Sequence, residues 1–142
     1  MIFKDPSKLN VGDLISDISI DRISRESLKA YAKASGDHNP IHIDKDLAQK
    51  FGLLDVIAHG MLVMSYLGKM LTNNFPQSAL VNFSSQFVSM TNINDKLVCS
   101  GKITKKTTDI SENVTYDFQL KVVNENGEKR ISGKASISIR GE

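Results

Sequence analysis

The sequence predicts a single α+β domain over residues 1–142, in which a curved antiparallel sheet wraps around one long buried helix. Two observations lead to this fold class. Residues 59–71 are apolar on nearly every side, which is typical of a helix buried in a core. From about residue 79 onward the apolar pattern has a period of two, which is typical of strands with one buried face. Such a face needs a cover, and the apolar helix can provide it.

The N-terminal part of the chain is predicted to form an arm, a strand and a helix. The arm covers residues 1–13 and ends in a turn at residues 10–13. Alternating apolar residues then predict a strand over residues 14–20. Ser24 is a good N-cap for a helix that ends near Ser35. This helix leads directly into the first motif discussed below.

Two further helices are predicted. Asp44 is placed to cap a short helix over residues 45–50, and residues 59–71 form the long apolar helix. The residues of the short helical segment expected to point inward are Leu47, Ala48 and Phe51.

Four strands are predicted in the C-terminal half, with turn signals at residues 92–95, 108–113 and 126–127. We therefore expect four successive strands to form an antiparallel meander, although alternation does not reveal the order of strands in a sheet. In each strand the residues expected to share one face are Val81, Phe83, Ser85 and Phe87; Leu97, Cys99, Gly101 and Ile103; Val114, Tyr116, Phe118, Leu120 and Val122; and Ile131, Gly133, Ala135, Ile137 and Ile139.

Composition excludes several classes of protein. A net charge of +2 gives no basis for a general nucleic-acid binder. The single cysteine, Cys99, excludes an intrachain disulfide, and three histidines without a cysteine or glutamate cluster argue against a metal site. The first residues lack the apolar core of a signal peptide, and no apolar run is long enough to span a membrane. We therefore expect a cytoplasmic protein that does not contact membranes, with Cys99 as a small buried hydrophobe.

The stretch Gly36-Asp37-His38-Asn39-Pro40-Ile41-His42 is the first part of the candidate site. Gly36 is typical of a helix C-cap with positive φ, and Pro40 forces the chain out of the helical conformation. Asp37 and His42 therefore lie on one short turn, where a carboxylate and an imidazole can share a water and exchange protons near neutral pH. The alternative is structural, because Asp and Asn side chains in such turns often bond to nearby backbone.

The stretch His59-Gly60-Met61 is the second part of the candidate site and opens the apolar helix. The first N–H groups of a helix have no intrahelical partner and carry partial positive charge. A carbonyl oxygen placed there is stabilised as negative charge develops on it. Gly60 suits this role because a side chain there would block a close approach to the backbone. An acid/base pair and such a donor are the minimum set for adding water beside a carbonyl.

Together the two motifs resemble those of the MaoC-like (R)-specific enoyl-CoA hydratases, a family with the hot-dog fold. The resemblance covers nearly the whole chain and implies the fold described above. It implies that Asp37 and His42 are the catalytic pair and that the Gly60 N–H polarises the thioester carbonyl. The residues that it places in contact with substrate are Asn39, His59, Met61 and Phe87.

Three of these substrate contacts have structural alternatives. The Asn39 side chain can fix the turn by bonding to backbone, His59 can orient the loop before the helix, and Phe87 can be a core residue of its strand. His38 is expected to lie in solvent.

The resemblance implies a hydro-lyase that interconverts trans-2-enoyl and (R)-3-hydroxyacyl thioesters, with no metal or redox cofactor. The thioester is carried by coenzyme A or by an acyl carrier protein. The resemblance also implies a homodimer, or a higher oligomer, whose sheets join edge to edge. Two alternatives stay open, namely a hot-dog thioesterase and a non-catalytic subunit that binds acyl thioesters.

Three stretches depart from the family pattern. Many hydratases carry a serine where Gly68 stands, and Arg-Pro or a similar pair where Asp55-Val56 stands. A later Pro/Gly-rich turn is reduced to residues 90–95, in which Asn94 can adopt positive φ. These departures leave the acid/base pair intact, but the acyl chain length and the preferred carrier stay open.

Basic residues are predicted to lie on the faces of the C-terminal strands. We expect them to be solvated, as most such charges are. The alternative is contact with a coenzyme A phosphate or an acidic carrier protein. The residues concerned are Lys102, Lys105, Lys106, Lys129, Arg130 and Lys134.

Overall fold

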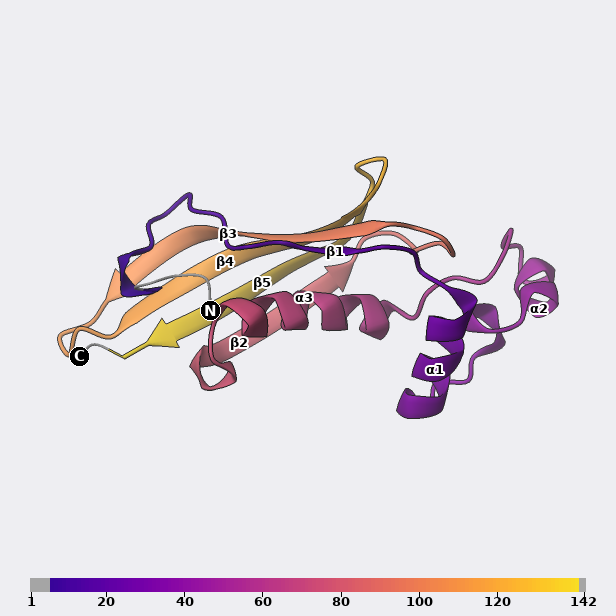
Figure 1. The fold of residues 1–142 in the computed structure, drawn as a ribbon, viewed down its shortest axis with the longest axis horizontal. Coiled ribbons are helices and arrows are strands. Elements are labelled where there is room, and N and C mark those ends of the chain that lie inside the picture. The colour runs from indigo at the N-terminus through magenta and orange to yellow at the C-terminus, as the bar shows by residue number, and fades with distance from the viewer. Residues whose placement is uncertain (1–5, 141–142) are drawn as a thin grey trace.

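The computed structural model describes residues 6–140 of the chain. Its five strands form one antiparallel sheet in the order β1-β3-β4-β5-β2. The long helix α3 lies along one face of this sheet, and α1 and α2 lie beyond the end of the sheet, near the start of α3 (Figure 1). The predicted α+β class is therefore confirmed. The elements are η1 (Pro6–Lys8), β1 (Ile18–Ile20), α1 (Arg25–Ser35), η2 (Pro40–His42), α2 (Lys45–Lys50), α3 (Gly60–Asn74), η3 (Gln77–Ala79), β2 (Leu80–Phe87), β3 (Leu97–Thr108), β4 (Val114–Asn124) and β5 (Lys129–Ile139).

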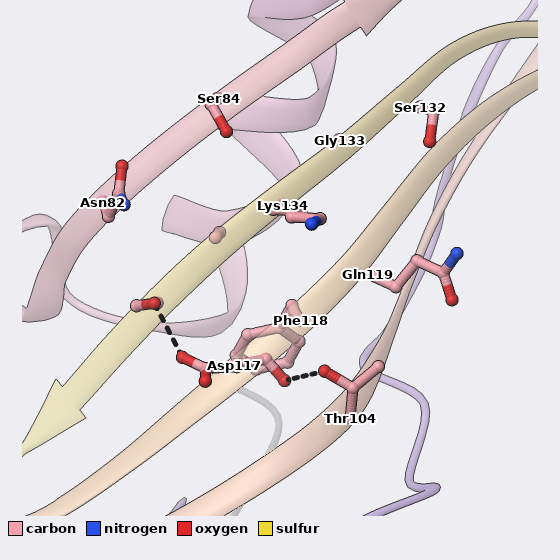
Figure 2. A pocket seen from close by; sticks show the side chains of 11 residues that line it. Asn82, Ser84, Thr104, Asp117, Phe118, Gln119, Ser132, Gly133 and Lys134 are labelled. Carbon is pink, nitrogen blue, oxygen red and sulfur yellow. Dashed lines mark hydrogen bonds between the residues drawn. The ribbon is translucent and has the colours of Figure 1, made fainter.

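The two faces of the sheet differ in chemistry because successive side chains of a strand point to opposite sides. On β3, β4 and β5 the buried residues include those predicted from alternation, such as Ile103, Phe118 and Ala135. The opposite face carries polar side chains, among them Gln119 and Lys134 (Figure 2).

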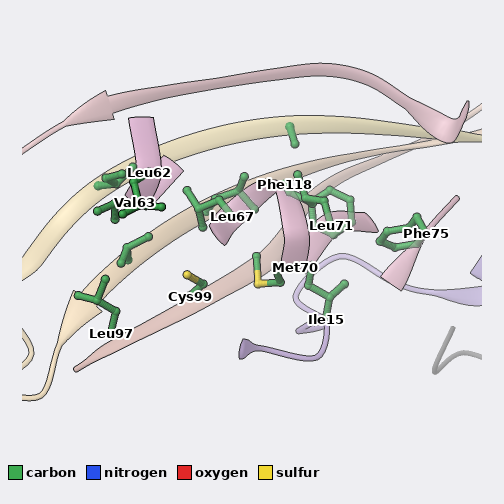
Figure 3. Close-up of a cluster of buried hydrophobic side chains, with 14 of the residues drawn as sticks. Ile15, Leu62, Val63, Leu67, Met70, Leu71, Phe75, Leu97, Cys99 and Phe118 are labelled. Carbon is green, nitrogen blue, oxygen red and sulfur yellow. The ribbon is translucent and has the colours of Figure 1, made fainter. Parts of the chain in front are cut away.

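The helix α3 is held mainly by its contact with the inner face of the sheet, where it packs against buried residues such as Phe118 (Figure 3). Burying an aliphatic side chain contributes about 1.5–3 kcal/mol. A Cβ at Gly133 on β5 would lie 3.0 Å from the Ser84 carbonyl oxygen of the neighbouring strand β2, but at an ordinary contact distance of 3.6 Å from Leu67 of α3. Within residues 6–140 no helix is both long and apolar enough to cross a bilayer. The apolar residues that α3 buries are Leu62, Val63, Leu67, Met70 and Leu71.

Cys99 lies inside this core and is fully buried. Burial raises the pKa of its thiol to about 12. The predicted role of Cys99 as a small buried hydrophobe is confirmed.

The first strand is shorter than predicted, and α3 is longer. The Asn74 side chain, at the end of α3, accepts a hydrogen bond from the Ser16 N–H (3.2 Å) and donates one to the Ser16 carbonyl oxygen (3.0 Å). These two backbone groups are therefore bound by a side chain instead of by β3. Regular pairing with β3 starts only at Ile18, with an isolated bridge between Leu14 and Lys102 before it. The predicted strand over residues 14–20 is thus interrupted, and residues 1–5 of the predicted arm lie outside the described residues.

The predicted meander of four strands is wrong for β2. This strand pairs with β5, at the opposite edge of the sheet from β1. The segment over residues 88–96 is consequently not a hairpin. It passes the start of α3, where the Thr91 carbonyl oxygen accepts from the Ala58 N–H at 2.8 Å. Because β2 is an edge strand with a bulge between Leu80 and Asn82, Val81 and Phe87 are exposed despite their alternation.

The predicted ends of α1 and α2 are confirmed. Ser24 caps α1, Gly36 follows it with φ of 79°, and Asp44 caps α2. Asn94 adopts the expected positive φ of 69°. The inward position predicted for Phe51 is wrong, because this residue is 68% exposed.

The physical reason for the exposure of Phe51 is the chain reversal that follows it. Gly52 has φ of 91°, and the Leu53 N–H donates to the Ala48 carbonyl oxygen at 3.1 Å. Leu53 thereby takes the position against the core.

Candidate active site

The turn that carries Asp37 is held by its own side chains. The Asp37 carboxylate accepts a hydrogen bond from the Asn39 N–H (3.2 Å), and the Asn39 side-chain oxygen accepts one from the Ile41 N–H (3.3 Å). Asn39 thereby caps η2, and its side chain makes the backbone bond considered above. Its contact with substrate stays a prediction. The turn leaves Asp37 exposed at the end of α1.

His42 is 9% exposed, and its Nδ1 lies 2.7 Å from the Ile57 carbonyl oxygen. A carbonyl oxygen can only accept, so Nδ1 carries the proton. In the neutral ring Nε2 then keeps its lone pair and is free to accept a proton. The segment that precedes α3 therefore sets the tautomer of His42.

His59 is 1% exposed and joins the two motifs. Its Nε2 donates to the Asp37 carbonyl oxygen at 3.1 Å, and its ring stacks on that of His42 with centroids 4.0 Å apart. Tyr31, on α1, meets the same ring edge-on at 4.8 Å. The structure thus shows His59 orienting the Asp37 turn, and its contact with substrate stays a prediction. Burial lowers the pKa of His59 below its ordinary value of 6.5.

Asp37, His42 and His59 each present one polar atom, and these atoms lie within 4.8 Å of one another. A water that makes two hydrogen bonds of about 2.8 Å can bridge groups up to about 5.5 Å apart. The cluster is therefore suited to holding a water. The same three residues are of types that also ligate metals, so the expected absence of a metal stays a prediction.

The start of α3 offers unpaired N–H groups beside this cluster. The His59 carbonyl oxygen accepts from the N–H groups of Leu62 (3.1 Å) and Val63 (3.3 Å). Among residues 6–140, neither the Gly60 N–H nor the Met61 N–H has an acceptor. A Cβ built on Gly60 would lie 2.7 Å from the Phe87 ring, so this ring packs directly against the Gly60 backbone.

A pocket of about 290 Å³ brings together His42, Gly60 and Phe87. Its remaining walls come from the segment before α3, from the segment that follows β2 and from the start of β5. Asp37, Asn39, His59 and Met61 do not line this pocket. Of the predicted acid/base pair, His42 lines the pocket and Asp37 does not, although a polar atom of each lies within 4.8 Å of the other.

A larger pocket of about 430 Å³ lies on the outer face of the sheet, among the polar side chains of Figure 2. None of the predicted site residues lines it. Its polar groups bond to one another, with the Ser136 hydroxyl donating to Asp117 at 2.7 Å and the Thr104 hydroxyl donating to the Asp117 carbonyl oxygen at 3.2 Å. This pocket holds no acid/base pair beside a free helix N-terminus, so we place the site at the smaller one.

Sequence reasoning missed Arg130, which was expected to be solvated. It is 5% exposed, lines the smaller pocket and forms an ion pair of 3.1 Å with Asp95. These residues are far apart in the sequence, and the strand pattern gives no sign of the pairing. The prediction of a solvated strand face is therefore wrong for Arg130.

Two departures from the family pattern have a structural counterpart. Asp55 accepts two hydrogen bonds from Arg25, of 3.0 and 2.6 Å, and so ties the loop before His59 to α1. Gly68 faces the Phe83 ring, which would lie 3.5 Å from a Cβ at this position.

Residues 13–126 match the family described as the MaoC like domain, and the chain belongs to this family. It is 37% identical over 90 residues to the mitochondrial 3-hydroxyacyl-[acyl-carrier-protein] dehydratase of Arabidopsis thaliana, covering 63% of this chain and 53% of that protein. It is 38% identical over 66 residues to 3-hydroxyacyl-thioester dehydratase X of Mycobacterium tuberculosis, covering 46% of this chain and 23% of that protein. The chain thus spans about half or less of these relatives.

Solved structures show the same fold. An R-hydratase from Pseudomonas aeruginosa, in the unliganded form, superposes with a TM-score of 0.81 at 24% identity, covering 96% of this chain and 85% of that one. The hot-dog fold expected from the motifs is confirmed by this likeness.

We expect Gly60→Ala to lower the rate of any reaction at this site by at least about tenfold, because the new methyl displaces Phe87 and obstructs approach to the helix N-terminus. The matched control is Gly68→Ala in the same helix. Its Cβ would meet Phe83 at an ordinary contact distance of 3.5 Å, and alanine favours a helix over glycine by about 1 kcal/mol. Steady-state rates and thermal unfolding of both variants test this. Equal rates in the two variants would contradict it.

We expect acid to destabilise the wild type more than a His59→Gln variant. The pKa of His59 lies below 6.5 in the fold, so the unfolded chain binds more protons below that pH. The contribution of the neutral ring is complete above pH 6.5 and is lost as the pH falls below it. Urea unfolding at about pH 7.5 and about pH 5.5 gives the free energy of unfolding of the wild type and of the variant at each pH. Identical pH dependence would show that His59 does not supply this sensitivity. The glutamine amide can keep the bond to the Asp37 carbonyl oxygen.

Proposed function

We propose that this protein is a hydro-lyase that interconverts trans-2-enoyl and (R)-3-hydroxyacyl thioesters. The observation that carries the proposal is one of geometry. One polar atom of Asp37 and one of His42 lie within 4.8 Å of each other, and Gly60, whose N–H has no acceptor among the described residues, lines the same pocket as His42. The names of the dehydratase relatives support the same reaction class.

The reaction requires a water, a proton path and a polarised carbonyl. In the hydration direction, Asp37 or the His42 Nε2 takes a proton from the shared water, and the oxygen of this water bonds to C3 of the enoyl group. The electron pair of the C2–C3 double bond moves to C2 and the thioester carbonyl, giving an enolate. The N–H groups at the start of α3 stabilise the negative charge on its oxygen. The proton held by the pair then passes to C2. One water thus supplies both the hydroxyl and the proton.

The direct test follows the loss of the conjugated enoyl absorbance of crotonyl-CoA, with the chirality of the product determined afterwards. We expect rapid formation of the (R)-3-hydroxy product. If crotonyl-CoA is not hydrated, the same assay is repeated with longer acyl chains and with enoyl thioesters of an acyl carrier protein. No hydration on any of these would refute the proposal.

Two alternative functions predict different products. A thioesterase releases a free thiol, which a thiol reagent detects in the same reaction mixture. A non-catalytic subunit binds the thioester without turnover, which calorimetry detects. A non-catalytic subunit has no need for the close approach of Asp37 and His42. A thioesterase can use the same pair to activate water, and the names of the dehydratase relatives favour the hydro-lyase over it.

We propose that the protein works as a homodimer. The outer edge of β2 has no partner strand among the described residues, and it exposes Val81 and Phe87. Free strand edges of this kind pair readily with another strand. Sedimentation velocity is expected to show the mass of two chains, and a monomer at micromolar concentration would contradict this.

The preferred carrier is a separate question. Comparing the hydration rates of the same enoyl group on coenzyme A and on an acyl carrier protein shows which carrier the protein prefers.

The cytoplasmic location expected from the sequence also stays a prediction, because the Arabidopsis relative is named as mitochondrial. The proposed reaction requires no metal or redox cofactor, and hydration by the dialysed protein in the presence of a chelator tests this.

A further inference from the structure

The pocket beside His42 has an exposed mouth and a buried inner end. Phe87, Val88 and Met90 form the mouth and are more than half exposed. Val63, Arg130 and Ile131 line the same pocket and are almost fully buried. The inner end therefore combines two apolar side chains with one guanidinium.

The guanidinium of Arg130 is held firmly at this inner end. Its Nε and one terminal nitrogen each lie 3.1 Å from Asp95 Oδ2, and the other terminal nitrogen donates to the Ser89 hydroxyl at 3.1 Å. Asp95 also accepts from the Asn92 N–H at 2.9 Å. Both charges are buried and bonded, and removing one partner from such a pair is strongly unfavourable.

The segment that carries these partners is fixed at both sides of the pocket. The Val88 N–H donates to the Arg130 carbonyl oxygen at 2.9 Å, and the Thr91 carbonyl oxygen accepts from the Ala58 N–H at 2.8 Å. Ala58 directly precedes His59 and the start of α3. The pocket wall can therefore not swing outward without disturbing both the ion pair and the segment that places Gly60.

We infer that the buried Arg130–Asp95 pair closes the acyl pocket and restricts this site to thioesters with short acyl chains. The inference rests on the proposed function for the nature of the ligand. A short chain fills the space lined by Val63 and Ile131. A longer chain must displace Ser89 or Arg130, and so must break bonds of a buried charge without replacing them. Arg130 is accordingly a specificity-determining residue of the proposed site.

The test compares butanoyl-CoA with decanoyl-CoA in binding, and crotonyl-CoA with trans-2-decenoyl-CoA in hydration. We expect the wild type to favour the short chain by at least roughly tenfold in Kd and in kcat/KM. The double variant Arg130→Met/Asp95→Asn removes both charges together, and we expect it to reduce this preference by at least roughly tenfold. The control is Lys134→Met, the same kind of change at an exposed position of β5, which should keep the wild-type preference.

The outcomes separate the inference from the function. Equal or better binding and hydration of the ten-carbon chain by the wild type would overturn the inference and leave the hydro-lyase intact. A short-chain preference in binding without any hydration would support the pocket depth and refute the reaction. If a folded double variant keeps the wild-type preference for short chains, the Arg130–Asp95 pair is not the cause of that preference, and the inference is wrong. If that variant does not fold, Ile131→Ala enlarges the same inner end without unpairing a charge, and it should then accept the longer chain.

Discussion

Asp37→Asn is expected to lower kcat for hydration by about 10²–10⁴, the usual contribution of a positioned proton transfer. An amide cannot take a proton from water at neutral pH. Its oxygen can still accept from the Asn39 N–H, as the carboxylate does at 3.2 Å, so the turn should keep its shape. The measurement is the initial rate of enoyl absorbance loss, with thermal unfolding as the check on folding.

The matched control for this variant is Asp44→Asn. Asp44 is also an exposed aspartate whose carboxylate accepts a backbone N–H, that of Leu47 at 3.1 Å. Asparagine is as good an N-cap as aspartate, so we expect the Asp44 variant to keep the wild-type rate. A folded Asp37 variant with more than about a tenth of wild-type activity would show that this carboxylate does not move the proton.

His42→Asn is expected to cost a similar factor of about 10²–10⁴ in kcat. The asparagine side-chain nitrogen can replace Nδ1 in the bond to the Ile57 carbonyl oxygen, now 2.7 Å. The variant leaves nothing at the position of Nε2, so it removes the proton acceptor and preserves the contact that places the residue. His38→Asn, the same change at an exposed position, is the control and should keep the wild-type kcat.

The double variant shows whether the two residues act on one water. If Asp37 and His42 form a unit, the variant with both changes should lose little more activity than the more damaging single change. Losses that multiply across the two sites would indicate independent roles. A wild-type rate in His42→Asn would exclude the ring as an acid or base.

Much of the fold could be predicted because the signals were local. The alternation on β3, β4 and β5 marked the buried faces, and the unbroken apolar run marked α3. The caps at Ser24, Gly36 and Asp44 depend on bonds within a few residues, so sequence spacing was enough to place them. The Asp37–His42 turn was predictable for the same reason, since Pro40 and the Asx side chains act within one stretch.

The errors arose where distant parts of the chain meet. The interruption at Ser16 is caused by Asn74, which the strand pattern at Ser16 cannot show. The pairing of β2 with β5 depends on how the sheet closes over α3, and alternation carries no strand order. The strand pattern predicted a solvated charge at Arg130, but the fold brings Asp95 against it and buries both side chains.

By itself the sequence determined the fold class, the turn that carries Asp37 and His42 and the helix that offers free N–H groups, because each rests on short-range spacing and periodicity. The tertiary structure alone decided that His42 receives its tautomer from Ile57, that His59 links the two motifs, and that Phe87 covers Gly60. It also decided that Arg130, paired with the buried Asp95, lines the pocket. These features join segments far apart in the chain, and only packing brings such segments within the few ångströms over which hydrogen bonds and steric contacts act.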